Sequence, residues 1–271
     1  MKILVTGAGG FVGHKLMETF EDAAAAPSLR NASEEEVRRV VEESGADAVI
    51  HTAAISDIGT CARNPEASYH ANVLLPVFLA KACGNRKLIC FSSDQVYSAC
   101  AGEGPYREEI VRPGNLYAEE KLEMEQRVLA IQPEAVLLRA EWMYDWYEQR
   151  SNYFMTILQA EKTVAFSSRQ YRGVTYLREV TENIERVIGL PGGVYNFGSE
   201  TDQSMAKITR AFADYIGKDI QVIEGPEKHN LWMDCSKARK YGVVFSDVLD
   251  GLKRCADDYR ERLNARLSSG K

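Results

Sequence analysis

The chain has 271 residues, of which 45% are hydrophobic and 27% charged, and its formal net charge is −6. A chain of this length can bury most of the surface that it exposes when unfolded, so it needs no disulfide or metal for stability. The acidic balance argues against nucleic acid or an anionic membrane as the main partner. No apolar run approaches the roughly 18 residues that a membrane-spanning helix requires.

The cysteines and histidines indicate neither a disulfide framework nor a metal site. The 6 cysteines form no CxxC pair and no Cys/His cluster with zinc spacing. His14, His70 and His229 are scattered along the chain. A predicted strand starts at Lys2, which leaves no signal peptide. We therefore expect a cytoplasmic protein with reduced thiols and no bound metal.

Short apolar runs alternate with amphipathic helices along the first half of the chain. Strands are predicted at 2–6, 23–29 (the weakest), 48–51, 87–91 and 135–139. Helices are predicted at 11–20, 33–43, 66–83 and 116–130. This alternation is typical of βαβ units with a parallel sheet, and right-handed crossovers place the helices on both faces. We predict an α/β, Rossmann-type doubly wound fold.

The pattern is less regular after Arg139. Helices are predicted at 152–160, 178–188, 205–216 and 247–267, and strands at 193–197 and 220–223. The strand at 193–197 is expected to return to the sheet. The sequence thus predicts a core in residues 1–165, to which residues 175–198 return, and a smaller C-terminal lobe in residues 199–271.

Three glycines between the first strand and the first helix have the spacing GxxGxxG. Such glycines allow a sharp turn, a close approach of the backbone to a diphosphate, and tight packing of the helix on the strand. Unpaired amides at the helix N-terminus then bind the phosphate charge. The position between a strand and a helix favours this interpretation over a purely structural turn. The predicted NAD(P)-binding loop contains Gly7, Gly9, Gly10, Phe11, Val12 and Gly13.

Residues after the weak second strand bear on which dinucleotide binds. An acidic residue there usually holds the ribose 2′-hydroxyl of NAD. This segment offers Ser28 and Arg30 instead. A hydroxyl and a guanidinium suit a 2′-phosphate better than a bare ribose, although Arg30 could equally be a solvated loop charge. The sequence therefore favours NADP(H) over NAD(H).

Tyr117 and Lys121 have the spacing YxxxK, which places both side chains on one face of the helix predicted at 116–130. A nearby cation favours the phenolate, so Lys121 is expected to lower the pKa of Tyr117. Tyr117 could then give a proton to a carbonyl oxygen as hydride arrives. Ser93 follows the strand at 87–91 and could hydrogen-bond the same oxygen, with a turn-forming serine as the alternative.

The chain resembles the extended short-chain dehydrogenase/reductase superfamily, and most of all the dTDP-4-dehydrorhamnose reductase family. The matching motifs arrive in the expected order at 6–13, 51–54, 91–97, 117–121, 137–145, 151–154 and 170–175. They cover nearly the whole chain. The resemblance implies an NAD(P)H-dependent reduction of a keto group on a nucleotide-linked sugar.

The resemblance also implies roles for particular residues. Ser93, Tyr117 and Lys121 match the family's catalytic Ser/Thr-Tyr-Lys set. The positions that match its cofactor-binding segments are Gly7, Gly10, Gly13, Ala53, Ala54 and Asn72. Tyr117 and Lys121 are also expected to contact the cofactor, with Lys121 orienting its ribose. The positions that match its sugar-nucleotide loops are Trp142, Asn152 and Arg172. We expect the small-molecule partner to be a nucleotide-sugar substrate. The C-terminal lobe is expected to face this substrate. The expected assembly is a homodimer.

Some positions depart from the family pattern. The segment between the first predicted helix and Ser33 is shorter than is usual for the family, which puts the adenosine-ribose pocket in doubt. Arg172 stands near where the family has a small or polar residue, and Val174 stands where it has proline. The substrate pocket is therefore expected to differ from that of the family.

Two other functions remain open at the level of sequence. A nucleotide-sugar epimerase or dehydratase shares the fold, but a dehydratase normally has further acid/base carboxylates after the serine. A non-catalytic NAD(P)-binding regulatory subunit is the alternative from another class. The intact pair of Tyr117 and Lys121 argues against it, because a binding module does not need that pair.

Overall fold

The computed structural model describes residues 1–226 and 230–269, so His229 and the last two residues of the predicted lobe lie outside the described residues. Its centre is a 6-stranded sheet in the order β2-β1-β3-β4-β5-β9, with every neighbouring pair parallel. The strands are β1 (Ile3–Thr6), β2 (Ala23–Ala25), β3 (Ala48–His51), β4 (Lys87–Ser93), β5 (Val136–Ala140) and β9 (Gly193–Phe197). The strand order reverses between β1 and β3, which is where open α/β sheets bind ligands.

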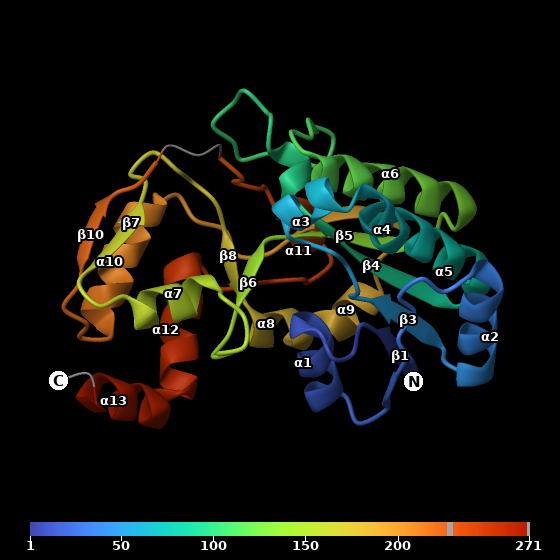
Figure 1. The fold of residues 1–271 in the computed structure, drawn as a ribbon, viewed down its shortest axis with the longest axis horizontal. Coiled ribbons are helices and arrows are strands. Elements are labelled where there is room, and N and C mark those ends of the chain that lie inside the picture. The colour runs from blue at the N-terminus through green and yellow to red at the C-terminus, as the bar shows by residue number, and fades with distance from the viewer. Residues whose placement is uncertain (227–229, 270–271) are drawn as a thin grey trace.

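Helices cover both faces of this sheet (Figure 1). One face packs against α1 (Phe11–Thr19), α8 (Leu177–Glu182) and α9 (Ile184–Ile188). The other packs against α2 (Glu34–Ser44), α5 (Leu75–Cys83) and α6 (Leu116–Ile131). The prediction of a Rossmann-type, doubly wound α/β fold is confirmed.

The strands read as continuous apolar runs because both of their faces are buried. Successive side chains of a strand point to opposite faces, so each strand contributes to two hydrophobic clusters. Val49 packs on the side of α2, α5 and α6, whereas Ile50 packs on the side of α1, α8 and α9. Leu137 and Leu138 divide in the same way.

Three predicted helices are interrupted, and the one predicted at 178–188 consists of α8 and α9. The helix predicted at 66–83 consists of α4 (Pro65–Tyr69), the π-helical turn η1 (His70–Leu74) and α5. The closing helix predicted at 247–267 consists of α12 (Val248–Asp258) and α13 (Arg260–Ser269). Elements that the sequence did not predict are α3 (Ile58–Arg63), the 3₁₀ turn η2 (Asp94–Tyr97), α11 (Ser236–Arg239), β6 (Trp142–Tyr144), β7 (Thr163–Phe166) and β8 (Val174–Tyr176). These elements have no more than 6 residues, too few to show a period.

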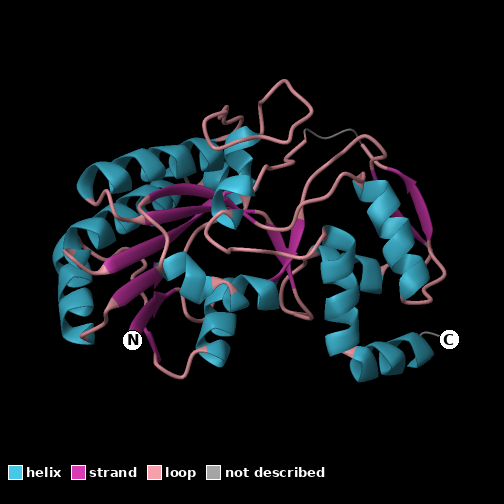
Figure 2. Cartoon of the chain, turned by 180° about the vertical axis from the view of Figure 1, so that it is seen from behind, coloured by secondary structure: helices cyan, strands magenta, loops and turns pink. Residues whose placement is uncertain are grey.

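A second body lies beside the carboxyl end of the sheet, and it appears on the right in Figure 2. It contains α7 (Tyr153–Gln159), β7, α10 (Met205–Tyr215), β10 (Gln221–Glu224), α12 and α13, and β7 pairs with β10. One hydrophobic cluster runs through it from Tyr144 to Leu263. Ala238 and Val243 pack on the sheet instead. The boundaries at residues 165 and 199 stay a prediction, and this packing leads us to propose that the lobe also includes α7 and β7.

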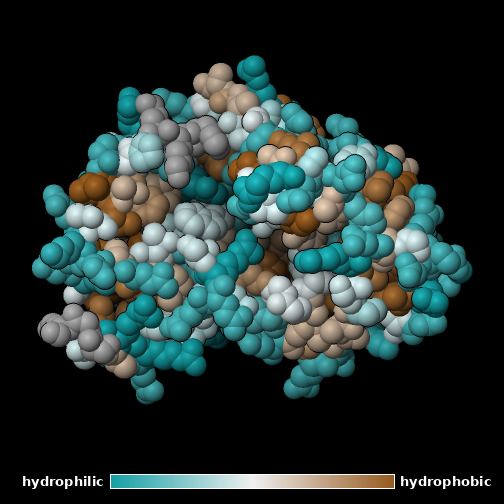
Figure 3. All heavy atoms as spheres, viewed as in Figure 1, coloured by the Kyte–Doolittle hydropathy of each residue, from teal (hydrophilic) through white to brown (hydrophobic). Residues whose placement is uncertain are grey.

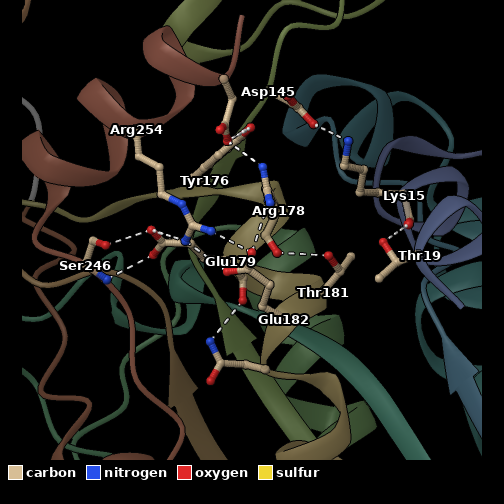
Figure 4. A network of polar contacts seen from close by, with 12 residues as sticks. Lys15, Thr19, Asp145, Tyr176, Arg178, Glu179, Thr181, Glu182, Ser246 and Arg254 are labelled. Carbon is tan, nitrogen blue, oxygen red and sulfur yellow. Dashed lines mark hydrogen bonds and ion pairs between the residues drawn. The ribbon is translucent and has the colours of Figure 1, made fainter.

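Ion pairs join the lobe to the sheet domain, as Figure 4 shows. Lys15 of α1 lies 3.4 Å from Asp145, a buried carboxylate that follows β6. Arg254 of α12 lies 2.6 Å from Glu182 and 3.2 Å from Glu179, both on α8. The lobe is therefore held against the same helices that cover one face of the sheet.

The surface adds little about partners. No described helix is long and apolar enough to cross a membrane. On the face drawn in Figure 3, hydrophobic residues are scattered among hydrophilic ones. Within the described residues, no group of histidine, cysteine and acidic side chains could hold a metal ion. The homodimer remains a prediction.

Candidate active site

A cleft of about 780 Å³ lies at the carboxyl ends of β1, β3, β4 and β5. Most of the residues that the sequence singled out come together in its wall. They are Gly7, Gly9, Gly10, Phe11, Val12, Ser28, Arg30, Ala53, Ala54, Ser93, Tyr117, Lys121, Trp142 and Arg172. Three predicted residues lie outside this wall, namely Gly13, Asn72 and Asn152.

The glycine loop has the shape that a diphosphate needs. Gly7 has a φ of 73°, and a Cβ there would lie 2.7 Å from the backbone nitrogen of Ala53. A Cβ on Gly13 would clash with the Gly7 carbonyl, so Gly13 allows the close packing of α1 on β1 without facing the cleft. No side chain caps α1 at Gly10, which leaves backbone donors at its first turn for an anion. The loop therefore fits a dinucleotide.

The outer end of the cleft carries Ser28 and Arg30, and both side chains are exposed. β2 ends at Ala25, and the chain then turns through Pro27 toward the cleft. Arg30 makes no hydrogen bond or ion pair with any residue that the structure describes. Its guanidinium is thus available to a ligand.

Tyr117 and Lys121 lie on the cleft side of α6. The Lys121 Nζ donates a hydrogen bond of 2.8 Å to the Phe91 carbonyl of β4 and lies 5.8 Å from the centre of the Tyr117 ring. Ser93 ends β4, and its hydroxyl lies near enough to the Tyr117 phenol to lower the pKa of that group, against the larger effect of burial. The three side chains thus meet where β4 and α6 adjoin.

Burial is the largest influence on the pKa values of Tyr117 and Lys121. It raises the pKa of Tyr117, which has 6% of its surface exposed, and the Asp94 charge raises that pKa further. Burial also lowers the pKa of Lys121 to about 8. The expectation that Lys121 lowers the pKa of Tyr117 is wrong for this structure, because desolvation of the phenolate outweighs the charge effects.

The opposite end of the cleft contains an ion pair that the sequence did not reveal. Arg172 lies 2.6 Å from Asp94, and both side chains are largely buried. Asp94 also accepts a hydrogen bond of 3.2 Å from the Ser93 hydroxyl. The Arg172 guanidinium lies 5.6 Å from the centre of the Trp142 ring. Arg172 therefore holds the carboxylate that accepts the hydrogen bond from Ser93.

Glu141 is a cleft residue that sequence reasoning missed. Its carboxyl accepts a hydrogen bond of 2.8 Å from Thr175, and burial raises its pKa well above the usual range. A Cβ on Gly173 or Gly198 would clash with this carboxyl. Glu141 and Thr175 are far apart in the chain, so no local spacing in the sequence indicates their contact.

Asn72 and Asn152 support the walls of the cleft from behind. Asn72 bonds both backbone polar groups of Ile55 and, at 2.8 Å, the buried Glu120 carboxylate. Asn152 caps α7 by accepting from the Met155 backbone N–H. Each asparagine holds a loop that borders the cleft, although neither side chain lines it.

We expect Asn115→Ala to lower the free energy of unfolding by about 1 kcal/mol. Asn115 caps α6, the helix that carries Tyr117, by accepting a hydrogen bond of 3.0 Å from the Ala118 backbone N–H. Urea denaturation measures the loss, and Asn115→Asp, which keeps the acceptor, is the control. Equal losses in the two variants would show that the cap contributes nothing.

Comparisons with known proteins bear on the whole chain. A family model described as RmlD substrate binding domain matches residues 1–256. The dTDP-4-dehydrorhamnose reductase of Mycolicibacterium smegmatis is 34% identical over 53% of this chain and 46% of that protein. The methionine adenosyltransferase 2 subunit beta of Xenopus laevis is 28% identical over 89% of this chain and 83% of that protein.

A solved structure agrees in fold. The dTDP-4-dehydrorhamnose reductase from Bacillus anthracis, in complex with NADP, has a TM-score of 0.84 and 20% identity over 95% of this chain and 100% of that chain. The family model runs through the glycine loop, the sheet and most of the lobe. This chain therefore belongs to the RmlD substrate binding domain family.

Proposed function

We propose that this chain is an NAD(P)H-dependent oxidoreductase that reduces a keto group on a nucleotide-linked sugar. The observation that carries the proposal is the position of Ser93, Tyr117 and Lys121 in one cleft, between the glycine loop and the end bordered by Trp142 and Arg172. The relatives named dTDP-4-dehydrorhamnose reductase support this substrate class. The related structure with NADP supports a nicotinamide cofactor.

The proposed mechanism assigns one task to each residue. Gly7, Gly10 and the first turn of α1 would hold the diphosphate of a reduced nicotinamide dinucleotide, which would supply a hydride to the carbonyl carbon. Tyr117 gives its proton to the carbonyl oxygen, and its raised pKa keeps that proton on the phenol until the oxygen becomes basic. Ser93 donates a hydrogen bond to the same oxygen. Lys121 donates to the Phe91 carbonyl near the carboxyl end of β4 and places its charge beside the phenol.

The fold, the glycine loop and the YxxxK pair lead us to place the chain in the extended short-chain dehydrogenase/reductase superfamily. Its acidic charge and its free cysteines favour the cytoplasm as the place of work. Trp142 and Arg172 are the side chains we propose to contact the sugar nucleotide. Asn152 would act on it only through the loop that it caps.

Arg30→Ala is expected to weaken NADPH binding about tenfold and to leave NADH binding within about twofold. Arg30 lines the ribose end of the cleft, and a charge-assisted hydrogen bond to the 2′-phosphate contributes at least about 1.5 kcal/mol. Calorimetric titration with each cofactor measures the change. Equal affinity of the parent and the variant for NADPH would refute a preference built on this residue.

An epimerase or dehydratase is less well supported by the geometry. The Asp94 carboxylate forms an ion pair with Arg172 and accepts a hydrogen bond from Ser93. A carboxylate paired with arginine is a poor proton donor. Tightly retained NAD⁺ on purification, with no net consumption of NAD(P)H, would favour an epimerase.

A regulatory subunit is a second candidate, and the comparison with methionine adenosyltransferase 2 subunit beta favours it specifically. That relative aligns with 89% of this chain, and the dTDP-4-dehydrorhamnose reductase of Aggregatibacter actinomycetemcomitans aligns with 93%, so the extent of alignment supports both candidates. A protein of this kind would bind the dinucleotide, reduce no keto sugar, and copurify with another enzyme subunit.

The experiment that separates these candidates has two stages. NADH and NADPH are first titrated separately to show which one binds. Keto-sugar nucleotides are then screened for loss of absorbance at the nicotinamide band. Consumption of NAD(P)H with one of them supports the reductase. Binding without turnover on any of them, together with a stable hetero-complex, supports the regulatory subunit.

A further inference from the structure

A short segment passes over the N-terminal end of α1, and we call residues 145–152 the strap. It connects β6 to α7. At its start, Asp145 forms the ion pair with Lys15 of α1 that Figure 4 shows. At its end, the Asn152 Nδ2 donates to the Arg150 carbonyl at 3.3 Å, while its Oδ1 caps α7. The strap is therefore attached to the molecule at both ends.

The middle of the strap rests on α1. The Tyr147 ring stacks on His14 with centroids 4.8 Å apart, and it packs against Phe11 at 5.3 Å. Phe11 is the first residue of α1 and lines the cleft. These ring contacts place the strap directly beside the glycine loop.

Arg150 extends from the strap across the cleft. Its Nη2 donates a hydrogen bond of 3.1 Å to the Ser56 hydroxyl, in the loop after β3. Its guanidinium carbon lies 5.7 Å from the centre of the Phe11 ring. Arg150, Phe11 and Ser56 all line the cleft. The cation thus lies between the first turn of α1 and the loop after β3.

No carboxylate among the described residues forms an ion pair with Arg150. This distinguishes it from Arg172, which is paired with Asp94. One hydrogen bond to a neutral hydroxyl leaves most of its five N–H donors free. An unneutralised guanidinium beside a helix N-terminus is a strong site for a phosphate group, since both attract the same anion.

We propose that Arg150 binds the diphosphate of the dinucleotide and holds the strap closed over it. This inference rests on the proposed function, because it takes the cleft to be a dinucleotide site. A nucleotide sugar carries the same diphosphate chemistry. The dinucleotide is favoured because Phe11 and Ser56 flank the glycine loop, whereas Trp142 and Arg172 mark the other end.

The test compares the binding of NADPH and of dTDP to the parent chain and to Arg150→Ala, without turnover. We expect the dissociation constant for NADPH to rise at least about tenfold, and that for dTDP to stay within about twofold. Arg150→Lys should recover part of the affinity for NADPH, because it keeps the positive charge. The recovery should be incomplete, because lysine lacks the planar set of N–H donors of a guanidinium. Arg38→Ala, which removes an exposed charge on α2, is the matched control.

Each result decides between the possibilities. Unchanged affinity for NADPH in Arg150→Ala overturns the inference and leaves the proposed function standing. A loss of affinity for dTDP alone also overturns the inference, and it would assign Arg150 to the substrate. Failure of the parent chain to bind either NADPH or NADH would overturn the proposed function itself. Because Arg150 is exposed, equal unfolding midpoints of parent and variant should verify that the fold is intact.

Discussion

Replacing Tyr117 with phenylalanine should lower kcat at least about 100-fold and leave the affinity for the cofactor within about twofold. The variant keeps the ring that packs at the edge of α6 and removes only the hydroxyl that carries the proton. Ser93 and Lys121 would remain in place, with their hydrogen bonds to Asp94 and to the Phe91 carbonyl. Steady-state rates with NADPH and a keto-sugar nucleotide measure the effect.

Tyr215→Phe is the matched control for this variant. The Tyr215 hydroxyl contacts Asp257 on the exposed surface of the lobe, away from the cleft. It should therefore react at the parent rate. If Tyr117→Phe also reacted at the parent rate, Tyr117 would not be the proton donor, and the assignment of the catalytic set would fail.

The largest effect on stability is expected for Arg139→Met, which should lower the free energy of unfolding by about 3–5 kcal/mol. Arg139 donates to both oxygens of Glu125, at 3.0 and 2.7 Å, and to the Tyr97 hydroxyl at 2.8 Å. Ser92 donates to the same carboxylate at 2.5 Å. Methionine would leave Glu125 charged and buried without a cation.

Urea denaturation of three variants tests this explanation. Arg38→Met breaks two exposed ion pairs on α2, with Glu35 and Glu42, and should cost at most about 1 kcal/mol. Replacing Arg139 and Glu125 together, as Arg139→Met with Glu125→Leu, should recover much of the loss because no unpaired charge remains. A small loss in Arg139→Met alone would show that the buried pair is not the source of stability.

This buried pair also bears on catalysis. Glu125 lies one helical turn after Lys121 on α6, and Ser92 immediately precedes Ser93 on β4. The network therefore fixes the spacing of the helix and the strand that carry the proposed catalytic side chains. Loss of the pair is expected to reduce turnover even at temperatures where the variant remains folded.

The features that the sequence predicted well are local ones. The glycine loop follows β1 directly, and Tyr117 and Lys121 are a single turn apart on one helix. The buried strands show as apolar runs because both of their faces are covered. In each case the residues that produce the feature are neighbours in the chain, so spacing alone reveals them.

The features that the sequence did not reveal depend on distant contacts. Asp94 and Arg172, and likewise Ser56 and Arg150, are far apart in the chain and meet only after the lobe docks on the sheet. The raised pKa of Tyr117 is also a tertiary property, since burial and not the nearby lysine dominates it. Asn72 was predicted as a site residue only because it matches a family motif. In the structure it lies in a π-helical turn, and its side chain hydrogen-bonds Ile55.

The most direct test of the reductase proposal follows the hydride itself. Parent protein is mixed with NADPH that carries deuterium at the transferable position and with the keto-sugar nucleotide that the screen identifies. We predict a hydroxyl product with deuterium on the former carbonyl carbon, in an amount equal to the NADPH oxidised. Product without the label, or bound NADPH that is never oxidised, would contradict the account.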